Sequence, residues 1–380
     1  MQAVTAFLPK TACPYTNLFH EIGISDNEVE KKIGFVWNNL FFGDSNTRIY
    51  FPTGNNMGYI YDTGNHDVRT EGMSYGMMLA VQMDQKNVFD RLWKWTKTYM
   101  YLKTGIHSGY FAWSVRPDGV KLSSEPAPDG EEYFAMALLF ASHRWGDSKP
   151  PFDYSDQARS ILHAMLHTGE DGIGFPMINP DNHLILFVPG CFFSDPSYHL
   201  PHFYRLFAQC CNKSDYVLWK KAAEASDHYL QSACHPKTGM AADYAEFDGT
   251  PRIQEGHEYF YSDAYRVTEN IALDSLWFGK QPWQSAQANA IQKYFLQNGL
   301  QLDNFKVYET NGKKIDRNAM HPYGLLSTLS CASVLTEQPL RQVYLQAFWK
   351  LPLRHGERRY YDNCLYFFAL LMLSGHYKIY

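Results

Sequence analysis

Two acidic segments, far apart in the chain, carry the residue types that acid–base chemistry requires. Glu71 lies in segment 67–76 and Asp263 lies in segment 261–266, and each stands near the start of an apolar, helix-like stretch with arginine and aromatic neighbours. Two carboxyl groups that face each other across a cleft, one protonated and one ionised, can hydrolyse a glycosidic bond. These residue types therefore indicate glycosidic bond cleavage, provided that the fold brings the two segments together.

Glu71 fits the acid in such a pair. Its apolar neighbours, among them Met73, Met77 and Met78, would raise its pKa by desolvation and keep it protonated near neutrality. A carboxylate at the start of a helix is also favoured by the helix dipole alone. Taken by itself, this segment favours that simpler interpretation.

Asp263 fits the base. A general base must stay ionised, and Arg266, about one helical turn further on, would favour the ionised form. Aspartate is also a preferred helix N-cap, and the segment alone favours a cap.

A third acidic group and a tryptophan extend the candidate site. Asp129 precedes Glu131 and Glu132 at the start of another apolar stretch. Asp-Gly is a turn signal, so Asp129 alone is also explained as a turn residue or a helix cap. Three acidic residues near one helix start, however, are more than capping requires. Trp113 either packs in the core or offers a flat face on which a sugar stacks. Considered by itself, it favours the core interpretation.

Other catalytic patterns are absent or incomplete. The sequence contains no HExxH, no GxGxxG that opens a helix after a strand and no GxxxxGK[ST], and we see no metal-ligand spacing among its 15 histidines. One GxSxG pattern occurs at 72–76, but a nucleophile elbow needs a strand ahead of it and a parallel sheet around it. The preceding residues 62–67 are polar and turn-like, which disfavours a serine hydrolase.

The elements that must position these residues are mostly helical. Stretches that are apolar on nearly all sides alternate with amphipathic ones. The apolar stretches begin near residues 71, 131, 201, 263, 323 and 361, and the amphipathic ones lie near 27–41, 87–101, 153–167, 215–233, 282–297 and 337–349. A helix that is apolar all round belongs inside, and one with a charged face belongs at the surface. The alternation predicts an all-α (α/α)6 barrel, although a two-layer α-solenoid gives a similar pattern.

Long loops are expected to carry the binding residues. Loops 103–130, 171–200 and 236–262 precede predicted inner helices and are rich in Gly, Pro, Asp and aromatic residues. Rigid scaffolds commonly present binding residues on such loops. Segments 171–192 and 306–309 are expected to add short strands at this face. No composition break marks a linker, so we predict a single domain over 1–380, with an N-terminal arm at about 1–25.

Composition excludes several partners. With 19% charged residues and a net charge of −5 among 380 residues, neither nucleic acid nor an anionic membrane is expected. The 16% aromatic content indicates an aromatic-rich core with a few rings for sugar stacking. No basic and apolar leader and no run of ~18 apolar residues is evident. Seven cysteines, several in apolar helical runs, favour reduced thiols and a cytoplasmic location.

The motifs together resemble those of glycoside hydrolase family 8, through most of the chain. Segment 70–78 resembles that family's general-acid motif, 127–145 its A-[ST]-D-G-D signature, 195–198 its N-P-S-Y and 261–266 its base motif. The resemblance implies an (α/α)6 barrel and hydrolysis with inversion, without a metal or organic cofactor. Pro128, Glu131 and Asp195 depart from the usual residues, which affects the expected sugar contacts more than the acid and base.

The resemblance also implies roles, residue by residue. Glu71 would protonate the leaving oxygen and Asp263 would activate water. The other implied contacts are Tyr198 holding that water, Asp129 binding and distorting the sugar, Trp113 stacking on a sugar and Arg266 orienting the carboxylates.

Within the family, the chain is most similar to members that release xylose from the reducing end of xylooligosaccharides. Segment 320–324 resembles their His-Pro element, which implies that His321 recognises the terminal reducing xylose and that its loop closes the cleft beyond it. Three alternatives stay open. They are an endo-acting member of the family on xylan, β-glucan or chitosan, a sugar epimerase or isomerase on the same barrel, and a sugar-binding protein without activity.

Overall fold

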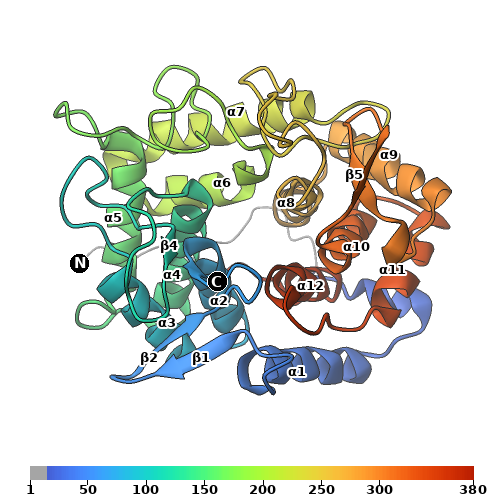
Figure 1. Ribbon diagram of the computed structural model, residues 1–380, viewed down its shortest axis with the longest axis horizontal. Coiled ribbons are helices and arrows are strands. Elements are labelled where there is room, and N and C mark those ends of the chain that lie inside the picture. Colours follow the sequence, from blue (N-terminus) through green and yellow to red (C-terminus); the bar gives the residue numbers. More distant parts are fainter. Residues whose placement is uncertain (1–14) are drawn as a thin grey trace.

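The helices form two concentric rings in the computed structural model, which describes residues 15–380 (Figure 1). The inner-ring helices are α2 (Thr70–Gln82), α4 (Pro128–Trp145), α6 (Pro201–Cys210), α8 (Tyr265–Phe278), α10 (Pro322–Cys331) and α12 (Arg359–Leu373). The outer-ring helices are α1 (Asp26–Phe42), α3 (Lys86–Tyr99), α5 (Tyr154–His167), α7 (Tyr216–Ala233), α9 (Pro282–Asn298) and α11 (Leu340–Lys350). Each ring member lies at a stretch that the sequence pattern predicts.

The inner ring closes on itself. Each inner helix packs against the next in the order α2, α4, α6, α8, α10 and α12, and α12 packs back against α2. The outer helices α3, α5, α7, α9 and α11 each cover the inner helix that precedes them, and α1 covers α12. Closure distinguishes a barrel from an open solenoid, so the predicted (α/α)6 barrel is confirmed.

Burial explains why the two kinds of helix sort into two rings. Every residue of α12 is buried, and α4 is buried from Pro128 to Ala141. The outer helix α3 buries Val88, Phe89 and Leu92 on one face and leaves its charged residues partly exposed on the other. A helix that is apolar all round gains most from complete burial, whereas a one-sided helix leaves its charges in water.

Two glycines allow the inner helices to approach closely where they begin. A Cβ atom at Gly72 would lie 2.7 Å from the ring of Tyr360, and one at Gly130 would lie 2.4 Å from the Cβ atom of Thr70. Neither contact leaves room for a side chain. The starts of α2, α4 and α12 therefore meet at one end of the barrel. This brings Glu71, on α2, near the starts of α4 and α12.

Short strands decorate the barrel. They form antiparallel pairs of β1 (Tyr50–Thr53) with β2 (Met57–Ile60), β3 (Val68–Arg69) with β4 (Ser114–Val115), and β5 (Lys306–Tyr308) with β6 (Lys314–Asn318). The strand predicted at 306–309 is confirmed. The one predicted at 171–192 is wrong, because Gly172 and Gly174 adopt left-handed backbone conformations and only an isolated bridge joins Ile178 to Ile185.

Short 3-10 helices complete the described elements. They are η1 (Leu18–Ile22), η2 (Pro196–Tyr198), η3 (Lys213–Asp215), η4 (Leu302–Asn304) and η5 (Ala332–Val334). The predicted N-terminal arm falls partly on residues 1–14, outside the described residues. Its remainder contains η1, which packs against α11. The division into one domain over 1–380 stays a prediction.

Two further sequence expectations concern cysteines and membranes. Within residues 15–380, Cys191, Cys210, Cys211, Cys234, Cys331 and Cys364 are all free thiols. In the same part of the chain, we find no helix with the length and apolar character that a bilayer crossing requires.

Candidate active site

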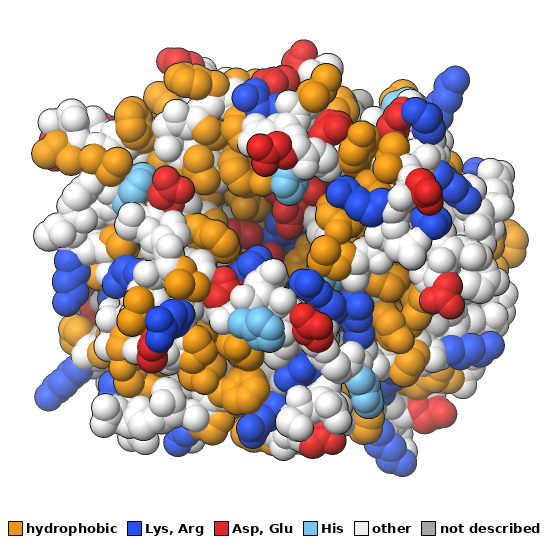
Figure 2. Space-filling view, in the orientation of Figure 1, with side chains coloured by type: hydrophobic (Ala, Val, Ile, Leu, Met, Phe, Trp, Pro, Cys, Tyr) orange, Lys and Arg blue, Asp and Glu red, His pale blue; other side chains and the backbone are white. Residues whose placement is uncertain are grey.

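A cleft opens at the end of the barrel where the inner helices begin. Figure 2 shows this face hollowed near its centre, with acidic and hydrophobic side chains in the hollow. Two adjoining cavities of about 200 and 310 Å³ make up the cleft, and both are lined by Arg69, Glu71 and Asp263. We call the first the His321 half and the second the Trp113 half, after residues that line only one of them. Glu71 and Asp263 therefore lie where the two halves meet.

Glu71 stands in the first turn of α2, and its carboxyl group is largely buried, with 15% of the side chain exposed. The hydroxyl of Tyr360 donates a hydrogen bond of 2.7 Å to its Oε1. Burial raises the pKa of Glu71 to about 7, against the opposing effect of Arg266 and with support from the nearby negative charges of Asp129 and Asp263. A carboxyl group with that pKa holds a proton at neutral pH in a substantial fraction of molecules, as a general acid must.

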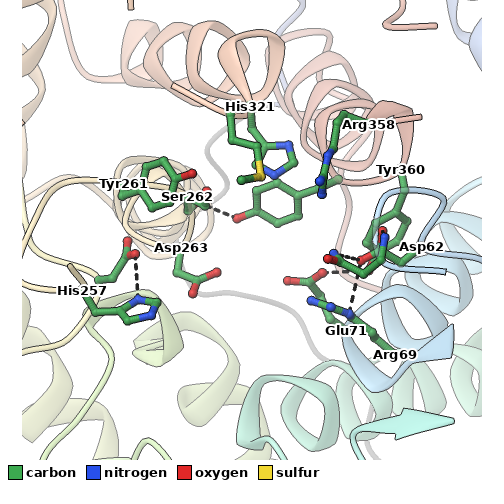
Figure 3. A pocket seen from close by; sticks show the side chains of 14 residues that line it. Asp62, Arg69, Glu71, His257, Tyr261, Ser262, Asp263, His321, Arg358 and Tyr360 are labelled. Atoms are coloured by element: carbon green, nitrogen blue, oxygen red, sulfur yellow. Dashed lines mark hydrogen bonds and ion pairs between the residues drawn. The ribbon is translucent and has the colours of Figure 1, made fainter. Parts of the chain in front are cut away.

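Asp263 approaches the same space from the opposite helix. Figure 3 shows both carboxylates pointing into the cleft. Asp263 lies just ahead of α8, whose N-cap is Ala264, and 32% of its side chain is exposed. Its carboxylate is thus free of the capping role and open to water or a ligand.

Arg266 connects the acidic groups. Its Nη1 lies 3.4 Å from Oε2 of Glu71 and donates 2.9 Å hydrogen bonds to Oδ2 of Asp129 and to the hydroxyl of Tyr75. Its Nη2 lies 3.2 Å from Oδ1 of Asp263. One guanidinium, 6% exposed, thus fixes three carboxylates relative to one another. Burial raises the pKa of Asp129, and the same guanidinium opposes that effect.

Trp113 lines one half of the cleft. The backbone oxygen of Trp113 accepts a 3.0 Å hydrogen bond from the backbone N–H of Thr70, next to the pairing of β3 with β4. The guanidinium of Arg69 lies 5.2 Å from the indole ring. The indole is therefore held beside the start of α2 and lines the cleft instead of packing wholly in the core.

Tyr198 lies in the same half, at the end of η2. Its side chain is buried among the aromatic rings, nearly parallel to Phe187 with ring centres 6.0 Å apart. The guanidinium of Arg266 lies 5.5 Å from its ring. Tyr198 is therefore within reach of the group that organises the carboxylates.

His321 lines the other half. Its Nδ1 lies 2.9 Å from Oδ2 of Asp362. Its ring packs against that of Tyr361 in a T-shaped arrangement, with the ring centres 4.9 Å apart. Asp362 also accepts a 2.6 Å hydrogen bond from the backbone of Gly324 and binds Arg354. Because Asp362 holds Nδ1, Nε2 of His321 is the ring nitrogen that can meet a ligand.

Comparison with known proteins places this arrangement in a family. The family model described as Glycosyl hydrolases family 8 matches residues 52–375. The chain belongs to glycosyl hydrolase family 8. The family predicted from the motifs is confirmed, and the protein is a glycoside hydrolase.

Two exo-oligoxylanases resemble this family 8 hydrolase over nearly their whole length. The reducing-end xylose-releasing exo-oligoxylanase Rex8A of Paenibacillus barcinonensis is 54% identical, with 96% of this chain and 97% of the relative aligned. A solved structure of Rex8A complexed with xylose superposes with a TM-score of 0.94, over 96% of this chain and 97% of that one. The reducing end xylose-releasing exo-oligoxylanase of Halalkalibacterium halodurans is 52% identical, over 96% of this chain and 94% of that one. Endoglucanase 2 of Ruminiclostridium josui is only 25% identical, over 82% of this chain and 65% of that one.

The structure brings together all seven predicted site residues of this family 8 hydrolase. They are Glu71, Trp113, Asp129, Tyr198, Asp263, Arg266 and His321, and each lines one half of the cleft or both. The neighbouring acids Glu131 and Glu132 line neither half. Glu131 accepts a 2.9 Å hydrogen bond from the backbone of Phe111, and Glu132 binds the hydroxyl of Tyr204. Both acids therefore position loops and helices.

Sequence reasoning missed Tyr360 and a pair beside Asp263, in which Asp243 is buried and His257 is partly exposed. Asp243 accepts a 3.0 Å hydrogen bond from the backbone N–H of Ala264, and its other oxygen lies 3.3 Å from Nδ1 of His257. Burial raises the pKa of Asp243 to about 6, and the hydrogen bond with His257 opposes that effect. Loop 236–262 was expected to carry binding residues, but no local motif marks these two.

Proposed function

We propose that this hydrolase releases xylose from the reducing end of xylooligosaccharides, with inversion at the anomeric carbon. One observation carries the proposal: Glu71, whose pKa is raised to about 7, and Asp263 bind different nitrogens of one guanidinium at the junction of the two cleft halves. A sugar chain that spans both halves would place a glycosidic bond between them.

The reaction needs one proton donor and one proton acceptor. Glu71 donates its proton to the oxygen of the glycosidic bond, and the bond from that oxygen to the anomeric carbon breaks. Asp263 takes a proton from water, whose oxygen forms the new bond to the same carbon. An inverting pair stands ~6.5–9.5 Å apart so that water fits between the base and the sugar. Two carboxylates held apart by the nitrogens of Arg266 support that arrangement.

The remaining residues would bind the sugar. Asp129 would bind and distort the sugar at the cleavage point, and Tyr198 would hold the attacking water. Trp113 would stack on a sugar in the larger half. His321 would recognise the single xylose in the smaller half of about 200 Å³. Arg266 would orient the carboxylates.

The choice of xylose and of exo action rests on the relatives, since those at 52–54% identity are named for that activity. The distant endoglucanase at 25% identity supports an endo-acting enzyme less. The cytoplasmic location expected from the cysteine pattern belongs to this proposal and is tested by fractionation of the producing cells.

Product analysis tests the function directly. Xylotriose is incubated with the enzyme and followed by NMR from the first minutes. We expect xylose and xylobiose only, with the xylobiose appearing first as its α-anomer. Early β-xylobiose would refute inversion, and mid-length fragments from longer chains would indicate an endo-acting enzyme. Interconversion of free sugars without cleavage would indicate an epimerase, and binding without product a sugar-binding protein.

Two substitutions test the roles of the acids. Glu71→Ala and Asp263→Asn should each abolish turnover of xylotriose while the circular dichroism spectrum stays that of the wild type. A near-native rate in either variant would remove that residue from its role.

A further inference from the structure

A cluster of possible metal ligands lies on the outer ring, among residues that do not line the cleft. His163 and His167 stand one helical turn apart on α5, and Asp215 stands just ahead of α7. Their ligand atoms all lie within 4.8 Å of one another. We propose that His163, His167 and Asp215 bind a divalent transition-metal ion such as Zn²⁺.

The distances fit a common ligand shell. Nδ1 of His163 lies 3.3 Å from Oδ2 of Asp215, and Nε2 of His167 lies 3.1 Å from Oδ1 of the same carboxylate. Four ligands at ~2.0–2.2 Å from a tetrahedral ion stand about 3.3–3.6 Å from one another. An ion can therefore take the place of the protons now shared across these contacts with only small side-chain movements.

Neighbouring groups hold the ligands in the orientation that binding requires. Oε1 of Glu170 lies 2.7 Å from Nδ1 of His167, which assigns the Nδ1 proton to that contact and turns Nε2 toward Asp215. The hydroxyl of Ser214 donates a 2.6 Å hydrogen bond to Oδ1 of Asp215. A carboxylate behind a metal-binding histidine fixes its ring and raises its basicity.

The site is open to solvent on one side only. Asp215 is 1% exposed, whereas 53% of the His163 side chain is exposed. Both histidines border a surface hollow of about 430 Å³, from which a water molecule can complete the coordination. Nitrogen and carboxylate ligands with an open position suit Zn²⁺, Co²⁺, Ni²⁺ and Cu²⁺ better than Ca²⁺ or Mg²⁺.

The expected effect of the ion is on stability. Helices α5 and α7 both lie in the outer ring (Figure 1), and an ion between His163, His167 and Asp215 would join the end of one to the start of the other. A ligand that binds only the folded state raises its stability. The i, i+4 spacing of the two histidines is a ligand spacing that the sequence analysis overlooked.

Titration calorimetry tests the site. Protein without a histidine tag is treated with a chelator, desalted and titrated with ZnCl₂. We expect one equivalent to bind to the wild type and its Tm to rise with Zn²⁺ concentration. The double variant His163→Asn, His167→Asn should lose this binding and this rise. Glu170→Ala should weaken binding by about 10–100-fold. His228→Asn, which changes an exposed histidine on α7, should leave it unchanged.

The spectrum of Co²⁺ gives a second measurement of the same site. Wild-type protein with one equivalent of Co²⁺ should show the visible absorption of four-coordinate, nitrogen- and oxygen-bound cobalt, and the double variant should not. Absence of Zn²⁺ binding by the wild type would overturn the proposal, as would equal binding by the double variant. The readouts do not depend on sugar cleavage, so the site is tested independently of the proposed function.

Discussion

Replacement of Glu71 by glutamine should change how the stability of the protein depends on pH. Glutamine keeps the shape of the side chain and an oxygen that accepts the hydrogen bond of Tyr360, but it cannot ionise. Burial raises the pKa of Glu71 from 4.5 to about 7. That difference corresponds to about 3 kcal/mol between the protonated and ionised states.

The sign follows from where the proton resides. Between pH 4.5 and about 7, the unfolded chain has lost this proton whereas the folded protein still holds it. The contribution of Glu71 to the free energy of unfolding therefore falls as pH rises through this window and stays low above it. The variant lacks this fall, so its stability relative to the wild type should increase by about 2–3 kcal/mol between pH 5 and pH 8.

Urea unfolding of both proteins at the two pH values measures this difference. If the stability difference between Glu71→Gln and the wild type is the same at pH 5 and pH 8, the carboxyl group does not have a raised pKa. Its assignment as the acid would then lose its physical basis.

Three further substitutions test how the site is built. The substitution Tyr360→Phe removes a hydrogen bond that lowers the pKa of Glu71. The alkaline limb of the kcat/KM profile should therefore move from about pH 7 to higher pH. An unmoved limb would contradict the assignment of that limb to Glu71. In Gly72→Ala, the new methyl group would lie 2.7 Å from the Tyr360 ring. Urea unfolding should therefore show that the free energy of unfolding falls by about 1–3 kcal/mol. Undiminished stability would refute the close approach of α2 and α12. In Trp113→Ala, loss of a stacking surface should raise KM for xylotetraose by about tenfold, equivalent to about 1.4 kcal/mol, and an unchanged KM would exclude stacking on this ring.

The sequence predicts the two rings because hydrophobic periodicity reports how much of each helix is buried. It also places Glu71, Asp129 and Asp263 at helix starts. These residues come together because the inner helices all begin at one end of the barrel. It does not reveal Tyr360, which comes from a helix 289 positions away from Glu71. Such a contact depends on how α2 and α12 are rotated against each other, and periodicity carries no information on that rotation.

The strands show the same limit at short range. The hairpin of β1 and β2 was not predicted. In the structure, Asn55 and Asn56 adopt left-handed conformations at its turn. Its strands are short and lie beside a helical barrel, so alternation over them is too brief to distinguish from a loop. The pair Asp243 and His257 was missed because irregular backbone brings the two together from separate parts of one loop.

The guanidinium of Arg266 and its three carboxylates form a charged cluster at the point of cleavage. One positive group serves three carboxylates, so with Glu71 neutral and both aspartates ionised the cluster carries an excess negative charge. A sugar that develops positive charge as its glycosidic bond breaks is attracted by that excess. A sugar that carries a carboxylate of its own, such as a uronic acid, is repelled by it. The cluster should therefore accept neutral oligosaccharides and reject acidic branches at the point of cleavage.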